Sequence, residues 1–274
     1  MTIALGILAT DGVVIAADTQ ESYGYAGAVK NDALKIIYFL DATIRNPRGV
    51  CAIAGAGDAG HVEAITMLLG NAFLTHHGLQ DEKLLDALNP VLRRFYDEHI
   101  IPFASYPAGE RPDATMLLGV QRLGVPRLFV SHQSCMRPVL QAYEAIGAGA
   151  AFAKMLLGRF WQPMDVKAAQ VLAAYVVFLT KESVEGCGKY TSVRTIYGPT
   201  FEDTPSGSRA TFSELVSALS AEEIDDMERL FRTKYALMEK RTLWQFVGDC
   251  VTPSAAAPKR PAARRVPKAP RRDR

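Results

Sequence analysis

Apolar and β-branched residues open the chain in two short runs separated by a polar turn. The first run spans residues 2–9, Thr10-Asp11-Gly12 interrupts it, and residues 13–18 continue it. Two such runs joined by a turn containing Asp-Gly predict a β-hairpin. A looser polar stretch follows, and the apolar segments 34–40 and 50–54 then predict two further strands.

Beyond Gly60 the apolar residues recur every three or four positions, the spacing of a helix face. Helices are predicted in two pairs, 59–76 with 81–100 and 149–160 with 164–181. Strands are predicted between and after these pairs, at 114–120, 127–131, 139–146 and 191–197. A late helix begins after Ser220, where Ser-Ala-Glu-Glu is a capping box, and extends to about residue 246. Strands and helices in separate blocks favour an α+β layered domain over βαβ alternation.

The composition places the chain among globular proteins. Of 274 residues, 49% are apolar and 22% charged, which excludes a collagen, a disulfide scaffold and wholesale disorder. The four cysteines lie far apart without metal-ligand spacing, so reduced structural thiols and no metal site are expected. No run of about 18 apolar residues is present, and Asp11 and Asp18 interrupt the first 19 residues, so neither a membrane span nor a signal peptide is expected. We therefore expect a soluble, cytoplasmic protein.

The last 24 residues differ from the rest of the chain. Residues 251–274 contain eight Lys or Arg and one Asp, whereas the whole chain has a net charge of +2. Pro, Ala, Arg and Lys dominate this segment and no aromatic residue could anchor it, so a disordered tail is predicted. Docking on an acidic surface and binding to nucleic acid are the alternatives; nucleic-acid binding is disfavoured because no aromatic side chain could stack on bases.

The second residue carries the chemistry of greatest interest. An initiator Met before a small residue is normally removed, which would make Thr2 the mature N-terminus. A threonine with a free α-amine combines a hydroxyl nucleophile with an adjacent base whose pKa is near 8.

Three segments carry a resemblance to a known family. They are TIALGILATDGVVIAADTQESYG at the N-terminus, AIAGAGDAGHVEAI from residue 52, and YEAIGAGAAFAKMLL from residue 143. In this order and at these separations they resemble proteasome β-type and HslV-type subunits, over roughly residues 2–200. The resemblance implies an N-terminal-nucleophile hydrolase with a four-layer αββα sandwich. It also implies one hydrolase domain at 2–250, with the helix at 221–246 added to its core.

The resemblance implies a catalytic set. Thr2 would be the nucleophile of a threonine-type peptidase, Asp18 would orient a lysine, and Gly55 would supply an oxyanion-hole N–H. Lys35 matches the lysine with a displacement of one residue, and Lys30 is the alternative. A lysine beside the threonine would favour loss of its proton by charge proximity.

The resemblance also implies a substrate-binding set. Ser22 would pair with the substrate backbone, and Glu21, Ile53 and Gly57 would line the pocket for the side chain before the cut. The carboxylate of Glu21 predicts acceptance of Arg or Lys there.

The sequence departs from the family pattern in two supporting positions. Where many relatives carry serines, Ala148 and Ala150 carry methyl groups. A second support could come from Glu182 or Ser183, and the sequence does not decide between them. These departures leave two alternatives: an active peptidase, or a catalytically silent structural subunit of a proteasome-like assembly.

The resemblance implies partners but no cofactor. A homo-oligomeric ring or stacked rings would enclose peptide or unfolded-protein substrates. A separate ATP-driven unfoldase would supply them, since the chain has no nucleotide-binding motif.

Overall fold

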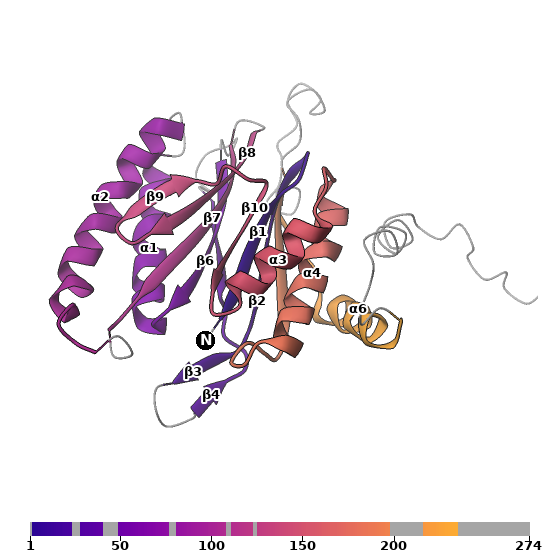
Figure 1. Cartoon of the computed structure of the whole chain (residues 1–274). Helices are drawn as coiled ribbons and strands as arrows, with labels where there is room; N and C mark the ends of the chain where they lie inside the picture. The colour runs from indigo at the N-terminus through magenta and orange to yellow at the C-terminus, as the bar shows by residue number, and fades with distance from the viewer. Residues whose placement is uncertain are drawn as a thin grey trace, which may run out of the picture.

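Two antiparallel sheets of five strands each form the centre of the molecule in the computed structural model (Figure 1). The structure describes residues 2–23, 28–40, 49–76, 81–107, 111–122, 125–197 and 216–234. Sheets and helices alternate in blocks along the chain, so the predicted α+β class is confirmed.

The first sheet has the order β10-β1-β2-β11-β12. Its strands are β1 (Ile3–Leu8), β2 (Gly12–Asp18), β10 (Tyr143–Gly147), β11 (Thr191–Tyr197) and β12 (Val216–Ala218). The second sheet has the order β5-β6-β7-β8-β9. Its strands are β5 (Ile36–Leu40), β6 (Gly49–Gly57), β7 (Ala114–Arg122), β8 (Val125–His132) and β9 (Cys135–Pro138).

Helices lie on the outer side of each sheet (Figure 1). The helices α1 (Ala59–His76) and α2 (Asp81–His99) share a buried cluster with the second sheet, and a short 3-10 helix, η2 (Ile101–Phe103), follows them. On the first sheet, α3 (Ala150–Phe160) and α4 (Val166–Ser183) do the same, and α6 (Ala221–Lys234) packs against α4. No helix in the described ranges is long and apolar enough to cross a membrane.

The sequence of strand β2 is continuously apolar because both faces of the strand are buried. Successive side chains point to opposite faces, so Val14 and Ala16 join the cluster beneath α4 while Val13 and Ile15 join the cluster between the two sheets. All four are fully buried, and burial of a Val or Ile side chain stabilises the fold by about 1.5–3 kcal/mol. The strand therefore holds its ends, including Asp18, in a fixed place.

Most sequence predictions of single elements are confirmed. The β1–β2 hairpin and the helices α1, α2, α3 and α4 lie within a few residues of their predicted bounds. Pro90 lies inside α2, which continues across it. The capping box at Ser220 and Glu223 is formed by reciprocal hydrogen bonds of 2.8 and 3.2 Å.

Two predictions of strands need correction. The polar stretch after Asp18, for which no strand was predicted, contains the small hairpin of β3 (Glu21–Tyr23) and β4 (Ala28–Lys30). The strand predicted at 139–146 begins only at Tyr143, as β10, and β9 before it was not predicted; between the two the chain passes from the second sheet to the first. The predicted end of the late helix, near residue 246, and the tail at 251–274 lie outside the described residues.

Candidate active site at the start of the first strand

Thr2 lies immediately before β1, an inner strand of the first sheet that pairs with both β10 and β2. Because β1 and β2 pair antiparallel, with Ala4 opposite Ala17, the start of β1 lies beside the end of β2, where Asp18 is located. The backbone N–H of Ile3 donates to Oδ1 of Asp18 at 3.1 Å. The hairpin thus brings the hydroxyl of Thr2 and the carboxylate of Asp18 to one end of the sheet.

Lys35 completes this group from the other sheet. It immediately precedes β5, and its Nζ donates to Oγ1 of Thr2 at 2.9 Å and to Oδ1 of Asp18 at 2.8 Å. It also donates to the carbonyl oxygen of Gln20. The side chain of Lys35 is 8% exposed and that of Asp18 is fully buried. A buried ammonium in contact with a hydroxyl favours loss of the hydroxyl proton, because the positive charge stabilises the resulting oxyanion.

The buried carboxylate of Asp18 accepts a third hydrogen bond. The backbone N–H of Gly188 donates to Oδ2 at 3.0 Å, so donors reach both carboxylate oxygens. A buried charge costs several kcal/mol unless it is paired and hydrogen-bonded, and here it is both. Asp18 is therefore suited to hold Lys35 against Thr2.

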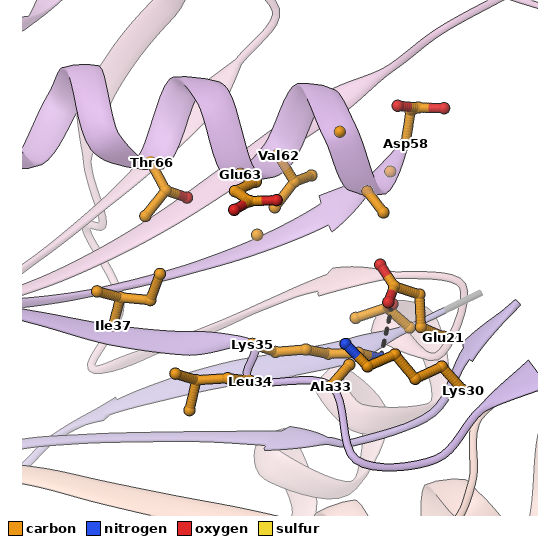
Figure 2. A pocket seen from close by; sticks show the side chains of 15 residues that line it. Glu21, Lys30, Ala33, Leu34, Lys35, Ile37, Asp58, Val62, Glu63 and Thr66 are labelled. Atoms are coloured by element: carbon orange, nitrogen blue, oxygen red, sulfur yellow. Dashed lines mark hydrogen bonds between the residues drawn. The ribbon is translucent and has the colours of Figure 1, made fainter. Parts of the chain in front are cut away.

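A pocket of about 470 Å³ opens beside Thr2 (Figure 2). Val62, Glu63 and Thr66 of α1 form one wall, and the facing wall includes Glu21, Lys30, Lys35 and Ile37. Gly55, Gly57 and Gly60 also line it. The pocket therefore combines an apolar surface with carboxylates and ammonium groups close to the Thr2 hydroxyl.

A second pocket, of about 480 Å³, also has Thr2 in its lining. It shares Thr2 and Gly57 with the first pocket, and its other lining residues are Ala56, Asp113, Thr115, Gly147 and Ala148. Thr2 thus belongs to two hollows of similar size.

The structure brings together most residues predicted for the site. Thr2, Asp18 and Lys35 are in contact, Gly55 and Gly57 line the first pocket, and Glu21 does so too. Lys30, the alternative lysine, lines the same pocket.

Other predicted residues lie elsewhere. Ile53 is fully buried in the cluster beneath α1 and does not line either pocket, because α1 covers it. Ala150 begins α3 and is also absent from the linings; its neighbour Ala148 lines the second pocket. Glu182 and Ser183 are exposed at the end of α4, where Glu182 accepts a hydrogen bond from Arg232. The side chain of Ser22 lies outside the described part of the chain.

Three residues of the site were missed. Gly188 binds Asp18, and Cys187 lies beside the same group, where burial and the charge of Asp18 raise the pKa of its thiol to about 11 although Lys35 lowers it. Glu63 lines the first pocket from α1. The glycine-rich run Gly186-Cys187-Gly188 was the available signal for the first two. For Glu63 no signal was available, because nothing in the sequence between Val62 and Thr66 indicates that this part of the helix lines a pocket.

The fold is similar to that of solved Anbu structures. A Gly-1 mutant of Anbu from Hyphomicrobium sp. strain MC1 matches with a TM-score of 0.63 and 17% identity, over 90% of this chain and 100% of that chain. Anbu (ancestral beta-subunit) from Yersinia bercovieri matches with a TM-score of 0.63 and 15% identity, over 86% and 97%. The structure titled "Helical Assembly of the Anbu Complex from Pseudomonas aeruginosa" matches with a TM-score of 0.62 and 14% identity, over 93% and 100%.

These matches correct the family suggested by the sequence. The resemblance to proteasome β-type and HslV-type subunits is wrong as an attribution, because the matching structures are Anbu proteins. Neither a protein-family model nor a curated protein gives a significant match. At these identities the likeness defines the fold.

Proposed function

We propose that the chain is an amide hydrolase that cleaves peptide bonds with Thr2 as nucleophile after removal of Met1. The observation that carries the proposal is the contact of 2.9 Å between Nζ of Lys35 and Oγ1 of Thr2, inside a pocket and fixed by buried Asp18. A hydroxyl that is hydrogen-bonded to a buried ammonium and lies next to a free α-amine is the arrangement of an activated threonine nucleophile.

The proposed reaction has two stages. Oγ1 of Thr2 attacks the substrate carbonyl carbon while its proton passes to the α-amine of Thr2. The C–N bond then breaks, and the leaving amine takes this proton, which leaves an ester on Thr2. Water attacks the ester with the same amine as base and releases the acid product. The N–H of Gly55 is proposed to stabilise the oxyanion, in keeping with its place in the lining of the first pocket.

The first pocket is proposed to bind the substrate on the acyl side of the bond. It adjoins Lys35 and Gly55, which serve the reacting carbonyl, and its walls contain the carboxylates of Glu21 and Glu63. These carboxylates support acceptance of a basic side chain before the cut.

The proposal extends to the fold and its assembly. Helices on the outer side of two sheets support a four-layer αββα sandwich of the N-terminal-nucleophile type (Figure 1). Because the matching Pseudomonas aeruginosa structure is described as a helical assembly, we propose that this chain forms a proteasome-like homo-oligomer around its substrates, as a ring, stacked rings or a helical array. Delivery of unfolded protein by a separate ATP-driven unfoldase is part of the same proposal.

The test combines mass and turnover. Intact mass spectrometry of the purified protein should show loss of Met1, and a set of fluorogenic peptides should be hydrolysed by wild type and by Thr2→Ser but not by Thr2→Ala. A peptide carrying a C-terminal electrophile should add its mass to the wild type alone. Retained Met1, or equal hydrolysis by Thr2→Ala, would contradict the proposal. Native mass spectrometry of the same sample reports the assembly.

A catalytically silent structural subunit is the second candidate. It is favoured by Ala148 and Ala150, whose methyl groups stand where the sequence resemblance implies serine hydroxyls; Ala148 lines the second pocket together with Thr2. In this case the assembly forms and Met1 is removed, but no peptide is cleaved and no electrophile adds to Thr2.

A further inference from the structure

The second pocket differs from the first in the charge of its lining. Of the residues that line it, Asp113 alone has a charged side chain, and Thr2 and Thr115 are the two residues with hydroxyls. The other lining residues are glycines and alanines. The first pocket, in contrast, contains both lysines and acids. The second pocket is thus a small-residue hollow with one carboxylate at its edge.

The position of Asp113 is fixed by the backbone around it. Its carbonyl oxygen accepts the N–H of Asp58 at 2.7 Å, and Gly57 pairs with Ala114 in the ladder between β6 and β7. Gly57 has a φ of +131°, and a Cβ there would lie 2.1 Å from the carbonyl oxygen of Asp113. A side chain at 57 would therefore displace Asp113, and glycine permits the close approach.

A second glycine fixes the other wall. Gly147 has a φ of +91°, and a Cβ there would lie 2.2 Å from the carbonyl oxygen of Thr2. Glycine at this position lets the backbone of β10 approach that of Thr2 closely, and both residues line the second pocket. Backbone contacts thus hold both sides of the pocket, Asp113 through Gly57 and Asp58, and Thr2 through Gly147 and Gly149.

The carboxylate of Asp113 has a neutral neighbour. Burial is the main cause that raises the pKa of Tyr96 to about 12, and the charge of Asp113 and a hydrogen bond with its side chain add to the rise. The hydroxyl of Tyr96 donates to the carbonyl oxygen of Ala114 at 2.6 Å. Tyr96 therefore stays neutral at physiological pH and adds no charge beside Asp113.

We propose that the second pocket binds the substrate residue on the amine side of the cleaved bond and that Asp113 makes it prefer a Lys or Arg side chain there. The inference rests on the proposed function of Thr2 as nucleophile. The substrate chain extends in two directions from the carbonyl carbon that Oγ1 of Thr2 attacks. On the acyl side it occupies the first pocket, beside Lys35. The amine side then takes the second pocket, whose one charge is negative. Asp113 is exposed, so the preference is of the modest size of a solvated ion pair.

The test uses internally quenched peptides that differ only at the residue after the cut. That residue is Lys, its neutral analogue norleucine, or Glu. Wild type should give a kcat/KM for Lys about three-fold above norleucine, the effect of an exposed ion pair. Asp113→Asn should equalise Lys and norleucine, and Asp113→Lys should favour Glu. The matched control is Asp226→Asn on α6, an exposed acid paired with Arg229, which should keep the wild-type preference.

A binding measurement separates this inference from the proposed function. Calorimetric titration of the Thr2→Ala protein with the product peptides Lys-Ala-Ala-amide and norleucine-Ala-Ala-amide should show tighter binding of the lysine peptide, and Asp113→Asn in the same background should abolish the difference. If this difference is seen while wild type cleaves nothing, the pocket stands and the proposed function fails. If peptides are cleaved and neither turnover nor binding distinguishes lysine from norleucine, the preference assigned to Asp113 is overturned. Equal binding together with absent turnover overturns both.

Discussion

The backbone N–H of Gly188 donates to Oδ2 of Asp18 at 3.0 Å, although 170 positions separate the two residues. The other oxygen of this carboxylate accepts the N–H of Ile3 and the ammonium of Lys35. One buried carboxylate therefore connects the nucleophile strand, the lysine beside the threonine, and the loop that follows α4. Any change that removes its charge acts on all three.

Replacement of Asp18 by Asn is expected to abolish hydrolysis and to destabilise the fold. The ammonium of Lys35 would remain buried without its carboxylate, and breaking a buried ion pair at one partner costs about 3–5 kcal/mol. The Lys35→Met variant should lose hydrolysis by about 10²–10⁴-fold, the range of an acid–base contribution. Urea unfolding and peptide turnover measure the two effects.

The double variant Asp18→Asn with Lys35→Met distinguishes an ion pair from two independent contributions. Without the ammonium, the missing carboxylate leaves no unpaired charge, so the double variant should be less destabilised than the sum of the singles. Arg94→Met is the matched control, since Arg94 pairs with Glu98 on the surface and its replacement should leave stability almost unchanged. Strict additivity of the two core changes would show that the pair is not coupled.

The elements around the site could be predicted from the sequence because their patterns are local. The hairpin of β1 and β2 follows from two apolar runs and one turn, and it alone places Asp18 beside Thr2. Lys35 could be identified only through the family resemblance, since its contact with Thr2 depends on how the second sheet lies on the first. The family attribution was wrong, but Thr2, Asp18 and Lys35, the residues that the resemblance singled out, are in contact.

The residues that were missed depend on packing between distant segments. Gly188 reaches Asp18 because Thr191 in β11 pairs with Asp18 in β2, a register that no local pattern reveals. Ile53 was expected in the pocket, but α1 crosses over β6 and buries it with Ile65 and Leu69. The pocket therefore opens at the first two turns of α1, where Glu63 is located.

Glu21 and Glu63 are expected to set a preference for Arg or Lys before the cleaved bond. Both line the pocket on the acyl side, from opposite walls. Peptides with Arg at this position should have a higher kcat/KM than peptides with Leu, and Glu21→Ala should remove or reverse the difference. Glu63→Gln should reduce it by about two- to five-fold, the effect of a partly solvated ion pair. Equal turnover of the Arg and Leu peptides by wild type would contradict the prediction.

Cys187 is expected to be an inert thiol near neutral pH and a source of alkaline instability. Its pKa is raised from 9.0 to about 11 by burial and by Asp18, so at pH 8 it has about a hundred-fold less thiolate than an ordinary thiol. In the unfolded chain the thiol loses its proton near pH 9, whereas in the folded chain it keeps it until about pH 11. Ionisation therefore favours the unfolded chain, and stability should fall between these two values and not below them.

Two measurements check this behaviour. At pH 8, iodoacetamide followed by peptide mass mapping should label exposed Cys135 well before Cys187. Urea unfolding between pH 8 and pH 11 should show a smaller loss of stability in Cys187→Ala than in wild type. Rapid labelling of Cys187 in the folded protein, or the same alkaline slope in both proteins, would contradict the assignment.

Glu228 is expected to be the main polar contact that fixes α6 to the body. It is buried, accepts Nζ of Lys181 at 2.6 Å and Oγ1 of Thr191 at 2.7 Å, and Lys181 also donates to the carbonyl oxygen of Lys189. Replacement by Gln keeps the shape but leaves the ammonium of Lys181 buried without a counter-charge, at a cost of about 3–5 kcal/mol.

The control is Glu182→Gln, whose partner Arg232 is 60% exposed, so this change should cost less than about 1 kcal/mol. Urea unfolding compares the stability of the two variants. Limited proteolysis reports whether α6 detaches first, because detachment would expose buried Phe231 and the helix around it to cleavage. Equal, small effects of both substitutions would show that apolar packing of Phe231 against Tyr175 and Phe178 suffices to hold the helix.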